Sequence, residues 1–238
     1  MIGNIRYKEI FKYMNNIVNY KNMRFTVVTP NLIRIEYSKS NVFVDEKTLF
    51  AQNRNMAEVS FKVEQDDEKI VIETKAIKLT YKNDNKPISE DNLFALIKTE
   101  NVDTIWKAHM KNKENLKGTL ATLDGVEGFV DLPDGLLSKD GWYVIDDSGL
   151  PIFKDHWIAN RPKESEMDWY LFGYGKNYKG ALKDLAYISG EMALPRKYIF
   201  GSWYSRWWPY TDKEFMEIVD EYDANDFPLD ILVMDMEQ

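Results

Sequence analysis

The chain has 238 residues, of which 44% are hydrophobic and 14% aromatic, with a formal net charge of −8. This length allows one large domain or a domain with part of a second. The acidic balance argues against a nucleic-acid partner, which would require a clustered basic face. The sequence has no cysteine, which excludes disulfides and thiolate chemistry and fits a cytoplasmic protein.

The sequence also argues against a membrane span and a metal site. Its longest apolar runs fall far below the ~20 residues that a spanning helix needs. The first residues of the sequence mix charged with hydrophobic side chains, unlike the apolar region of a signal peptide. The two histidines, His109 and His156, lie far apart in the sequence. We therefore expect no membrane partner, no metal and no other cofactor.

Residues from about 23 to 190 are predicted to be mostly β-structure. Two strand-like runs are separated by the turn pair Pro30-Asn31. In the second run, charged Arg34 and Glu36 alternate with apolar residues, as in a half-buried strand. Short strands separated by polar turns at this spacing predict an antiparallel β-sandwich.

A loop rich in glycine and aspartate follows, from about residue 122 to residue 149. These residue types favour turns and left-handed backbone conformations. Loops of this length inside compact domains are often functional. The spacing of its acids does not match an EF-hand, so calcium binding is the less favoured alternative.

Near residue 176 the hydrophobic period changes from two to that of a helix. The spacing of apolar residues predicts a helix at about 177–189. Thr211 and Glu214 have the spacing of a capping box, which predicts the start of another helix. The chain therefore changes from antiparallel β-structure to an α/β pattern.

Two strands, at about 198–205 and 230–236, flank the second predicted helix. A strand, a helix and a second strand with a continuous apolar run predict a β-α-β unit with parallel strands. We therefore expect a sandwich domain with a terminal helix at residues 1–190 and a second domain at 191–238. A (β/α)8 barrel needs ~250 residues, so this second domain is expected to be only the truncated start of one.

The ends of these two strands carry the candidate site residues. Alternation places Asp235 and Glu237 on one face of the last strand, where a barrel would hold its active site; otherwise, Asp235 is a turn or cap residue. The earlier strand ends in a segment containing Trp203, Arg206 and Trp207. These residues predict either packing or a sugar platform with an arginine donor.

Four segments, in this order, resemble glycoside hydrolase family 31, the α-glucosidase and α-xylosidase family: GLLSKDGWYVIDDS, DWYLFGYG, YIFGSWYSRWWPYTDKEF and PLDILVMDM. The resemblance begins near residue 23 and is densest from Leu116 to Met236. It implies a sandwich similar to galactose mutarotase, followed by a catalytic (β/α)8 barrel. By the same resemblance, residues 198–236 would supply the first β-α-β of that barrel.

The resemblance also implies roles for individual residues. Asp235 matches the aspartate of barrel strand two that hydrogen-bonds hydroxyls of the sugar in the −1 subsite. Trp207 falls near the aromatic residue that walls this pocket, and Trp203 lies on the strand before it. All three are therefore expected to bind substrate.

Three further residues are candidates of the same kind. Arg206 lies beside the aromatic residues, and Asp140 belongs to a loop resembling the sandwich loop that the family folds over the barrel mouth. Glu237 is followed by Gln238, whereas relatives usually have another acid and then Trp-His. This departure leaves the role of Glu237 open.

No catalytic residue is assigned in this chain. Family members retain configuration and use two carboxyl groups on later strands or loops. Such groups lie about 5–5.5 Å apart across the scissile bond. Asp235 and Glu237 project from one strand and cannot flank a sugar from opposite sides. We therefore expect the N-terminal part of a retaining α-glycosidase, inactive alone.

Two other functions stay open. The chain could be a stand-alone carbohydrate-binding or regulatory module, or one half of a split glycosidase. In each case a carbohydrate is the expected ligand of the protein or of its parent enzyme. An unpaired strand edge and apolar surface at residues 198–238 further predict self-association.

Overall fold

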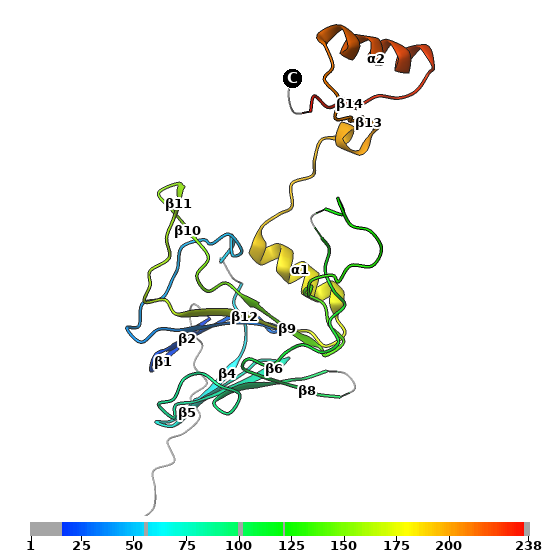
Figure 1. Cartoon of the computed structure of the whole chain (residues 1–238). Helices are drawn as coiled ribbons and strands as arrows, with labels where there is room; N and C mark the ends of the chain where they lie inside the picture. Colours follow the sequence, from blue (N-terminus) through cyan, green and yellow to red (C-terminus); the bar gives the residue numbers. More distant parts are fainter. Residues whose placement is uncertain (1–15, 55–56, 100–101, 121, 236–238) are drawn as a thin grey trace, which may run out of the picture. The chain divides into compact units, whose positions relative to one another are not determined.

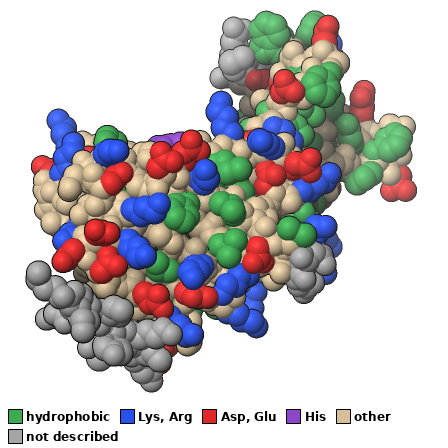
Figure 2. All heavy atoms as spheres, turned by 90° about the horizontal axis from the view of Figure 1, so that it is seen from below, with side chains coloured by type: hydrophobic (Ala, Val, Ile, Leu, Met, Phe, Trp, Pro, Cys, Tyr) green, Lys and Arg blue, Asp and Glu red, His purple; other side chains and the backbone are tan. Residues whose placement is uncertain are grey.

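The computed structural model describes residues 16–54, 57–99, 102–120 and 122–235. The chain divides into two compact units, Met1–Glu191 and Met192–Gln238. Acidic and basic side chains are interspersed on the face shown in Figure 2. Within the described ranges, no helix is long and apolar enough to cross a membrane.

The first unit is a sandwich of two five-stranded antiparallel sheets (Figure 1). One sheet has the order β1-β2-β3-β12-β9 and the other the order β4-β5-β6-β7-β8. The strands of the first sheet are β1 (Ile17–Tyr20), β2 (Met23–Thr29), β3 (Leu32–Tyr37), β12 (Met167–Gly173) and β9 (Trp142–Asp146). Those of the second are β4 (Lys62–Gln65), β5 (Lys69–Glu73), β6 (Ile77–Lys82), β7 (Leu93–Ile97) and β8 (Thr104–Lys107). The predicted mainly-β, antiparallel fold is confirmed.

The main core lies between the two sheets. Alternate residues of β2 and β3 point into it, and Phe25, Ile33 and Ile35 are fully buried there. Ile77 and Leu79 of β6 enter the core from the second sheet. Each such side chain contributes about 1.5–3 kcal/mol through burial. The period-two pattern in the sequence therefore sets which face of each strand forms the core.

A second layer covers the other face of the first sheet. Helix α1 (Tyr178–Ser189) begins at the cap Asn177, whose side chain accepts a hydrogen bond from the amide of Gly180. Its residues Ala181 and Ile188 pack with an apolar cluster on that face. Beyond β9, a hairpin of β10 (Ile152–Lys154) and β11 (Trp157–Ala159) projects from the unit (Figure 1).

Strand β3 is buried on both faces, so the prediction that it is half-buried was wrong. Its charged residues Arg34 and Glu36 are 4% and 1% exposed. Arg34 donates two hydrogen bonds of 2.7 Å each to the carboxylate of Asp168 on β12. Arg24 on β2 donates to both carboxylate oxygens of Glu36, at 2.6 and 2.9 Å. The alternation of charged and apolar residues along β3 was predicted correctly. The face that carries the charged residues is nevertheless covered by another segment of the chain.

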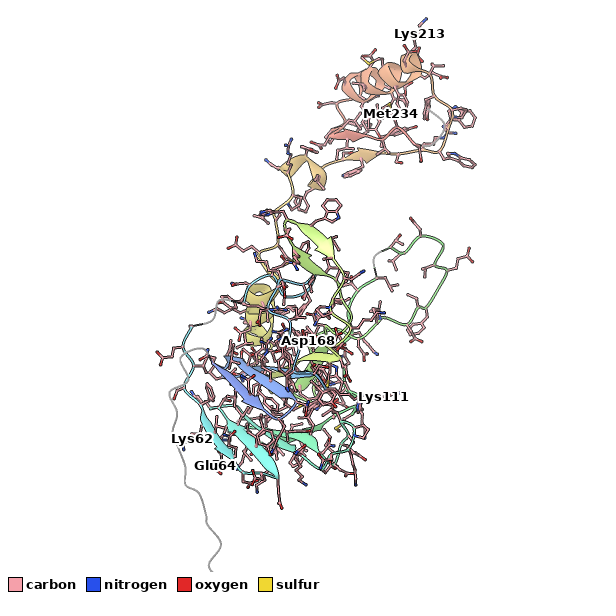
Figure 3. The ribbon with its side chains drawn as sticks, turned by 90° about the vertical axis from the view of Figure 1, so that its left-hand side faces the viewer. Lys62, Glu64, Lys111, Asp168, Lys213 and Met234 are labelled. Carbon is pink, nitrogen blue, oxygen red and sulfur yellow. The ribbon has the colours of Figure 1, made fainter. Side chains whose placement is uncertain are left out.

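Arg161 extends this buried charge cluster across the sheet. It donates to Asp168 at 2.8 Å and to Asp147 at 3.1 Å. Asp147 is fully buried and also accepts from the hydroxyl of Thr48 at 2.8 Å. Burial raises the pKa of Asp147, although the bond from Thr48 and the nearby arginines oppose the shift. Figure 3 labels Asp168 within the sandwich.

The second unit is a β-α-β element. A short 3-10 helix, Lys197–Phe200, precedes β13 (Trp203–Tyr204), α2 (Asp212–Ala224) and β14 (Ile231–Leu232). The two strands pair in parallel, as predicted. Both strands are shorter than the predicted ranges, 198–205 and 230–236. In the first range, residues 198–200 belong to the 3-10 helix instead. The short ladder is consistent with each strand having one partner within the described part of the chain.

The capping box predicted at the start of α2 is present. The hydroxyl of Thr211 accepts from the amide of Glu214, and the carboxylate of Glu214 accepts from the amide of Thr211 at 2.7 Å. These two bonds satisfy amide groups that the first turn of a helix leaves unpaired. The hydrogen bonds that the carboxylate accepts from the amide and from the hydroxyl of Thr211 lower the pKa of Glu214.

Asp168→Asn is expected to destabilise the sandwich unit strongly at neutral pH. The substitution removes the negative charge between Arg34 and Arg161 and leaves their buried charges uncompensated. Breaking a buried pair in this way typically costs about 3–5 kcal/mol. Urea denaturation at pH 7 would measure the loss in free energy of unfolding.

The same variant has a predicted pH dependence. Burial by itself raises the pKa of Asp168, but the hydrogen bonds and charges of Arg34 and Arg161 lower it overall. A lowered folded-state pKa stabilises the fold above the unfolded value near 3.8. That stabilisation is lost as the pH falls through the folded-state pKa. The difference between wild type and variant should therefore shrink in acid; a pH-independent difference would contradict the assignment.

Asp45→Asn serves as the control. The side chain of Asp45 is 77% exposed and pairs with Arg24 at the rim of the same cluster. Exposed ion pairs contribute about 0–1 kcal/mol. This control should therefore lose far less stability than the Asp168 variant.

Candidate functional site

The candidate site lies where the parallel strands β13 and β14 end. The amide of Ile231 donates to the carbonyl of Ser202 at 3.1 Å, and the amide of Val233 donates to the carbonyl of Tyr204 at 3.0 Å. These bonds fix the two strand ends as neighbours. Carboxyl ends of parallel strands meet at one edge, where barrel folds carry their active sites.

The aromatic residues at the end of β13 take different positions. Trp203 is 51% exposed, and its indole nitrogen donates to the carbonyl of Ile199 at 2.8 Å, which ties the ring to the preceding 3-10 helix. Trp207 is 70% exposed. The guanidinium of Arg206 lies 4.6 Å from the ring centroid of Trp208, a cation–π contact. The segment therefore exposes the side chain of Trp207 to solvent, and its neighbours Arg206 and Trp208 form a stacked pair.

Tyr210 connects the polar tips of this segment. Its hydroxyl lies 2.6 Å from that of Tyr204. This hydrogen bond is the main cause of a raised pKa at Tyr204, with desolvation second. A hydrogen bond to Tyr210 likewise raises the pKa of Arg206. The sequence contains Tyr210 in the WWPY run, but its role as a partner of two candidate residues was not predicted.

Asp235 follows β14 and is partly buried. Its neighbour Met234 is 70% exposed and is labelled in Figure 3. Glu237 lies outside the described residues. Trp207 follows the last residue of β13, Tyr204, and Asp235 follows the last residue of β14, Leu232, each after a short stretch of chain without regular structure.

Asp140 belongs to the first unit and has a local structural role there. Its carboxylate accepts from the amides of Lys113 and Glu114, at 2.6 and 3.0 Å. These bonds join the two ends of the segment that connects β8 to β9. A second tie in the loop is the ion pair of Lys117 and Asp134, at 2.7 Å.

Metal chemistry finds no support in the described part of the chain, because no three His, Cys, Asp or Glu side chains there are placed to hold an ion. In the buried cluster, Arg34 and Arg161 donate to the carboxylate of Asp168, and Arg161 also donates to that of Asp147.

The chain thus combines a mainly-β sandwich with a parallel β-α-β unit. Residues 192–238 match the model of the glycosyl hydrolases family 31 TIM-barrel domain. This match covers the second unit of the chain and not the sandwich. Comparison with the curated proteins found no match.

Two solved structures of a family 31 dextranase from Flavobacterium johnsoniae share the fold. The complex with isomaltotriose, of a mutant enzyme, is 14% identical with a TM-score of 0.55. The complex with glucose is 12% identical with a TM-score of 0.54. Each match covers 92% of this chain and 31% of the dextranase. The chain therefore spans about a third of the length of these enzymes.

Gly201→Ala is expected to loosen the pairing of β13 and β14. A Cβ at Gly201 would lie 2.1 Å from a carboxylate oxygen and 2.7 Å from the Cβ of Asp230. That carboxylate accepts from the amide of Ser202 at 2.9 Å. Because rotating the carboxylate leaves the second clash in place, the backbone must shift.

The amides of Ile231 and Val233, which cross-link the strands, should then exchange with deuterium at least about tenfold faster. Gly118→Ala is the matched control, because the nearest atoms to its added Cβ are 3.5 Å away and in the first unit. Unchanged exchange at both amides in the Gly201 variant would show that the junction does not depend on this contact.

Proposed function

We propose that this chain forms the sandwich and the first β-α-β of a retaining α-glycosidase that cleaves terminal α-linked glucosides or xylosides. The observation that supports this function is the placement of Asp235 and Trp207 after two neighbouring parallel strands. This segment matches the barrel domain of the family. In barrels this edge holds the substrate.

Each candidate residue has a specific role in the proposal. Asp235 accepts hydrogen bonds from hydroxyls of the sugar at the non-reducing end, and charge strengthens such bonds. Trp207 packs its exposed ring against the sugar face, with Trp203 behind it. Arg206 contributes a donor beside them. No cofactor takes part, and the cysteine-free sequence supports a cytoplasmic enzyme.

The nucleophile and the general acid/base are proposed to lie outside these 238 residues. Retaining hydrolysis needs two carboxyl groups about 5–5.5 Å apart on opposite sides of the scissile bond. Asp235 lies on one strand end only, so it can bind the sugar but cannot supply both groups. The isolated chain is therefore proposed to be inactive.

The full-length gene product, screened on nitrophenyl α-glucoside and α-xyloside, tests the activity. Asp235→Asn in that protein should lower kcat/KM by about 10- to 100-fold, because a charged hydrogen bond to substrate contributes about 1.5–3 kcal/mol. Asp220→Asn, on the exposed face of α2, is the control and should leave kcat/KM within about twofold. The purified 238-residue chain should show no hydrolysis.

Two results would contradict the proposal. Hydrolysis by the 238-residue chain would show that it holds its own catalytic pair. Full activity of the Asp235 variant would remove this residue from the sugar site.

A carbohydrate-binding module is the second candidate, supported by the exposed ring of Trp207 and the stacked Arg206–Trp208 pair. It predicts that the isolated chain binds isomaltotriose without cleaving it, and that Trp207→Ala removes the binding. A split enzyme predicts instead a separate polypeptide whose addition restores hydrolysis. Titration calorimetry and a reconstitution assay separate these alternatives.

We also propose that the isolated chain self-associates through residues 198–238. Phe215 is the one buried hydrophobic residue among the described residues of this unit, at 9% exposure, whereas Phe200, Phe227 and Met234 are exposed. Exposed apolar surface and open strand edges favour association.

Sedimentation at increasing concentration should therefore show dimers or larger species, and removal of residues 192–238 should restore a monomer. A monodisperse monomer of the whole chain at all concentrations would contradict this proposal.

A further inference from the structure

We infer that residues 42–54, here called the strap, form a latch that holds the C-terminal end of α1 and is closed by the buried charge cluster. The strap has no regular helix or strand. It nevertheless contains fully buried residues, Val44, Thr48 and Ala51. An irregular segment that is buried this deeply must satisfy its polar groups through specific partners.

The carbonyl of Val44 is the main contact between the strap and the cluster. It accepts hydrogen bonds from three guanidinium groups, those of Arg24 at 3.0 Å, Arg34 at 2.9 Å and Arg54 at 3.1 Å. Two of these arginines lie on sheet strands and the third on the strap itself. One backbone oxygen therefore joins the strap to the charged face of the sheet.

The strap also adds one charge of each sign to the cluster, those of Asp45 and Arg54. Four arginines meet three buried carboxylates, and the remaining positive charge is paired by Asp45 of the strap, 2.7 Å from Arg24. The carboxylates and arginines are Glu36, Asp147, Asp168, Arg24, Arg34, Arg54 and Arg161. Because desolvated charges need partners, lifting the strap would take the Val44 carbonyl away from Arg24 and Arg34 and leave these buried guanidinium groups short of an acceptor.

The other end of the strap holds the helix. The amides of Gln52 and Asn53 both donate to the carbonyl of Ile188 in the last turn of α1, at 2.8 and 3.0 Å. The last four carbonyls of a helix lack partners within it. The strap therefore provides the cap that the end of α1 needs.

Thr48 links the two ends of the latch. Its hydroxyl donates to Asp147 of the cluster at 2.8 Å and accepts from the amide of Ala51 at 2.8 Å. This pair of bonds sets the turn that presents Gln52 and Asn53 to the helix. A cluster that holds Thr48 in place thus also holds the end of α1, from which the chain leaves the first unit.

Arg54→Met tests the latch. The substitution keeps the apolar stem but removes the donors to the carbonyls of Val44 and Glu46 and the charge near Asp147. With the strap loosened, the amides of Gln52 and Asn53 should exchange with deuterium at least tenfold faster. The amides of the last turn of α1 should also become faster, while those of β3 and β12 stay unchanged.

Lys62→Met, on the exposed edge strand β4 (Figure 3), is the matched control and should change none of these rates. If the Arg54 variant does not fold, Thr48→Val removes only the hydroxyl and provides the same readout. Unchanged exchange at Gln52 and Asn53 in a folded variant would overturn the inference. A uniform increase over the whole sandwich would also overturn it, because it would indicate general destabilisation without a latch.

Discussion

The ion pair of Arg34 and Asp168 is the contact on which the organisation of the sandwich depends. It joins β3 to β12 across 134 residues of sequence, with both oxygens of the carboxylate engaged at 2.7 Å. In the register of these strands, Arg34 lies opposite Tyr170 and Asp168 opposite Glu36, so the pair is diagonal. A slip of either strand by one residue would turn its own charged side chain toward the hydrophobic core. The pair therefore specifies register more than it adds stability, since buried pairs recover little beyond their desolvation cost.

This pairing explains why an irregular segment can be buried against the sheet. Charged side chains on β2 and β3 would ordinarily face water, but here Arg24 pairs with Glu36 of β3 and Arg34 pairs with Asp168 of β12. Every remaining donor then needs an acceptor, and a passing backbone supplies carbonyl oxygens without adding bulk. The sheet thus has an apolar region under α1 and a charged region under the strap, and both are closed to solvent.

Local sequence predicted the strands, the Pro30-Asn31 turn and the capping box of α2, because each depends on residues close in the chain. The burial of Arg34 and Glu36 depends on Asp168, which is too distant for periodicity to reveal. A pattern of alternating charge and apolar residues is the same whether the charged face meets water or a partner layer. The one usable signal was an arginine and a carboxylate two residues apart on a strand otherwise made of leucine, isoleucine and tyrosine.

The candidate site was predicted in part for a different reason. The order of strand, helix and strand placed Asp235 and Trp207 at adjacent strand ends, which follows from topology alone. The contacts of Tyr210 and the turn of Trp203 toward Ile199 depend on side-chain rotamers and could not be read from spacing. Roles in sugar binding came from the family resemblance, so they rest on four matching segments and the barrel-domain match.

The two units differ in how completely they bury their own hydrophobic side chains. This difference bears on which unit can form a functional site by itself. The sandwich closes two apolar clusters and a charge cluster within itself. The β-α-β unit buries Phe215 but exposes Trp207, Phe200 and Phe227. Since burial of apolar area supplies most folding free energy, the first unit has the means to be stable alone, whereas the second gains most from surfaces beyond its described residues. The residues proposed to bind sugar thus lie on the unit with the least internal packing, and their geometry depends on what that unit packs against.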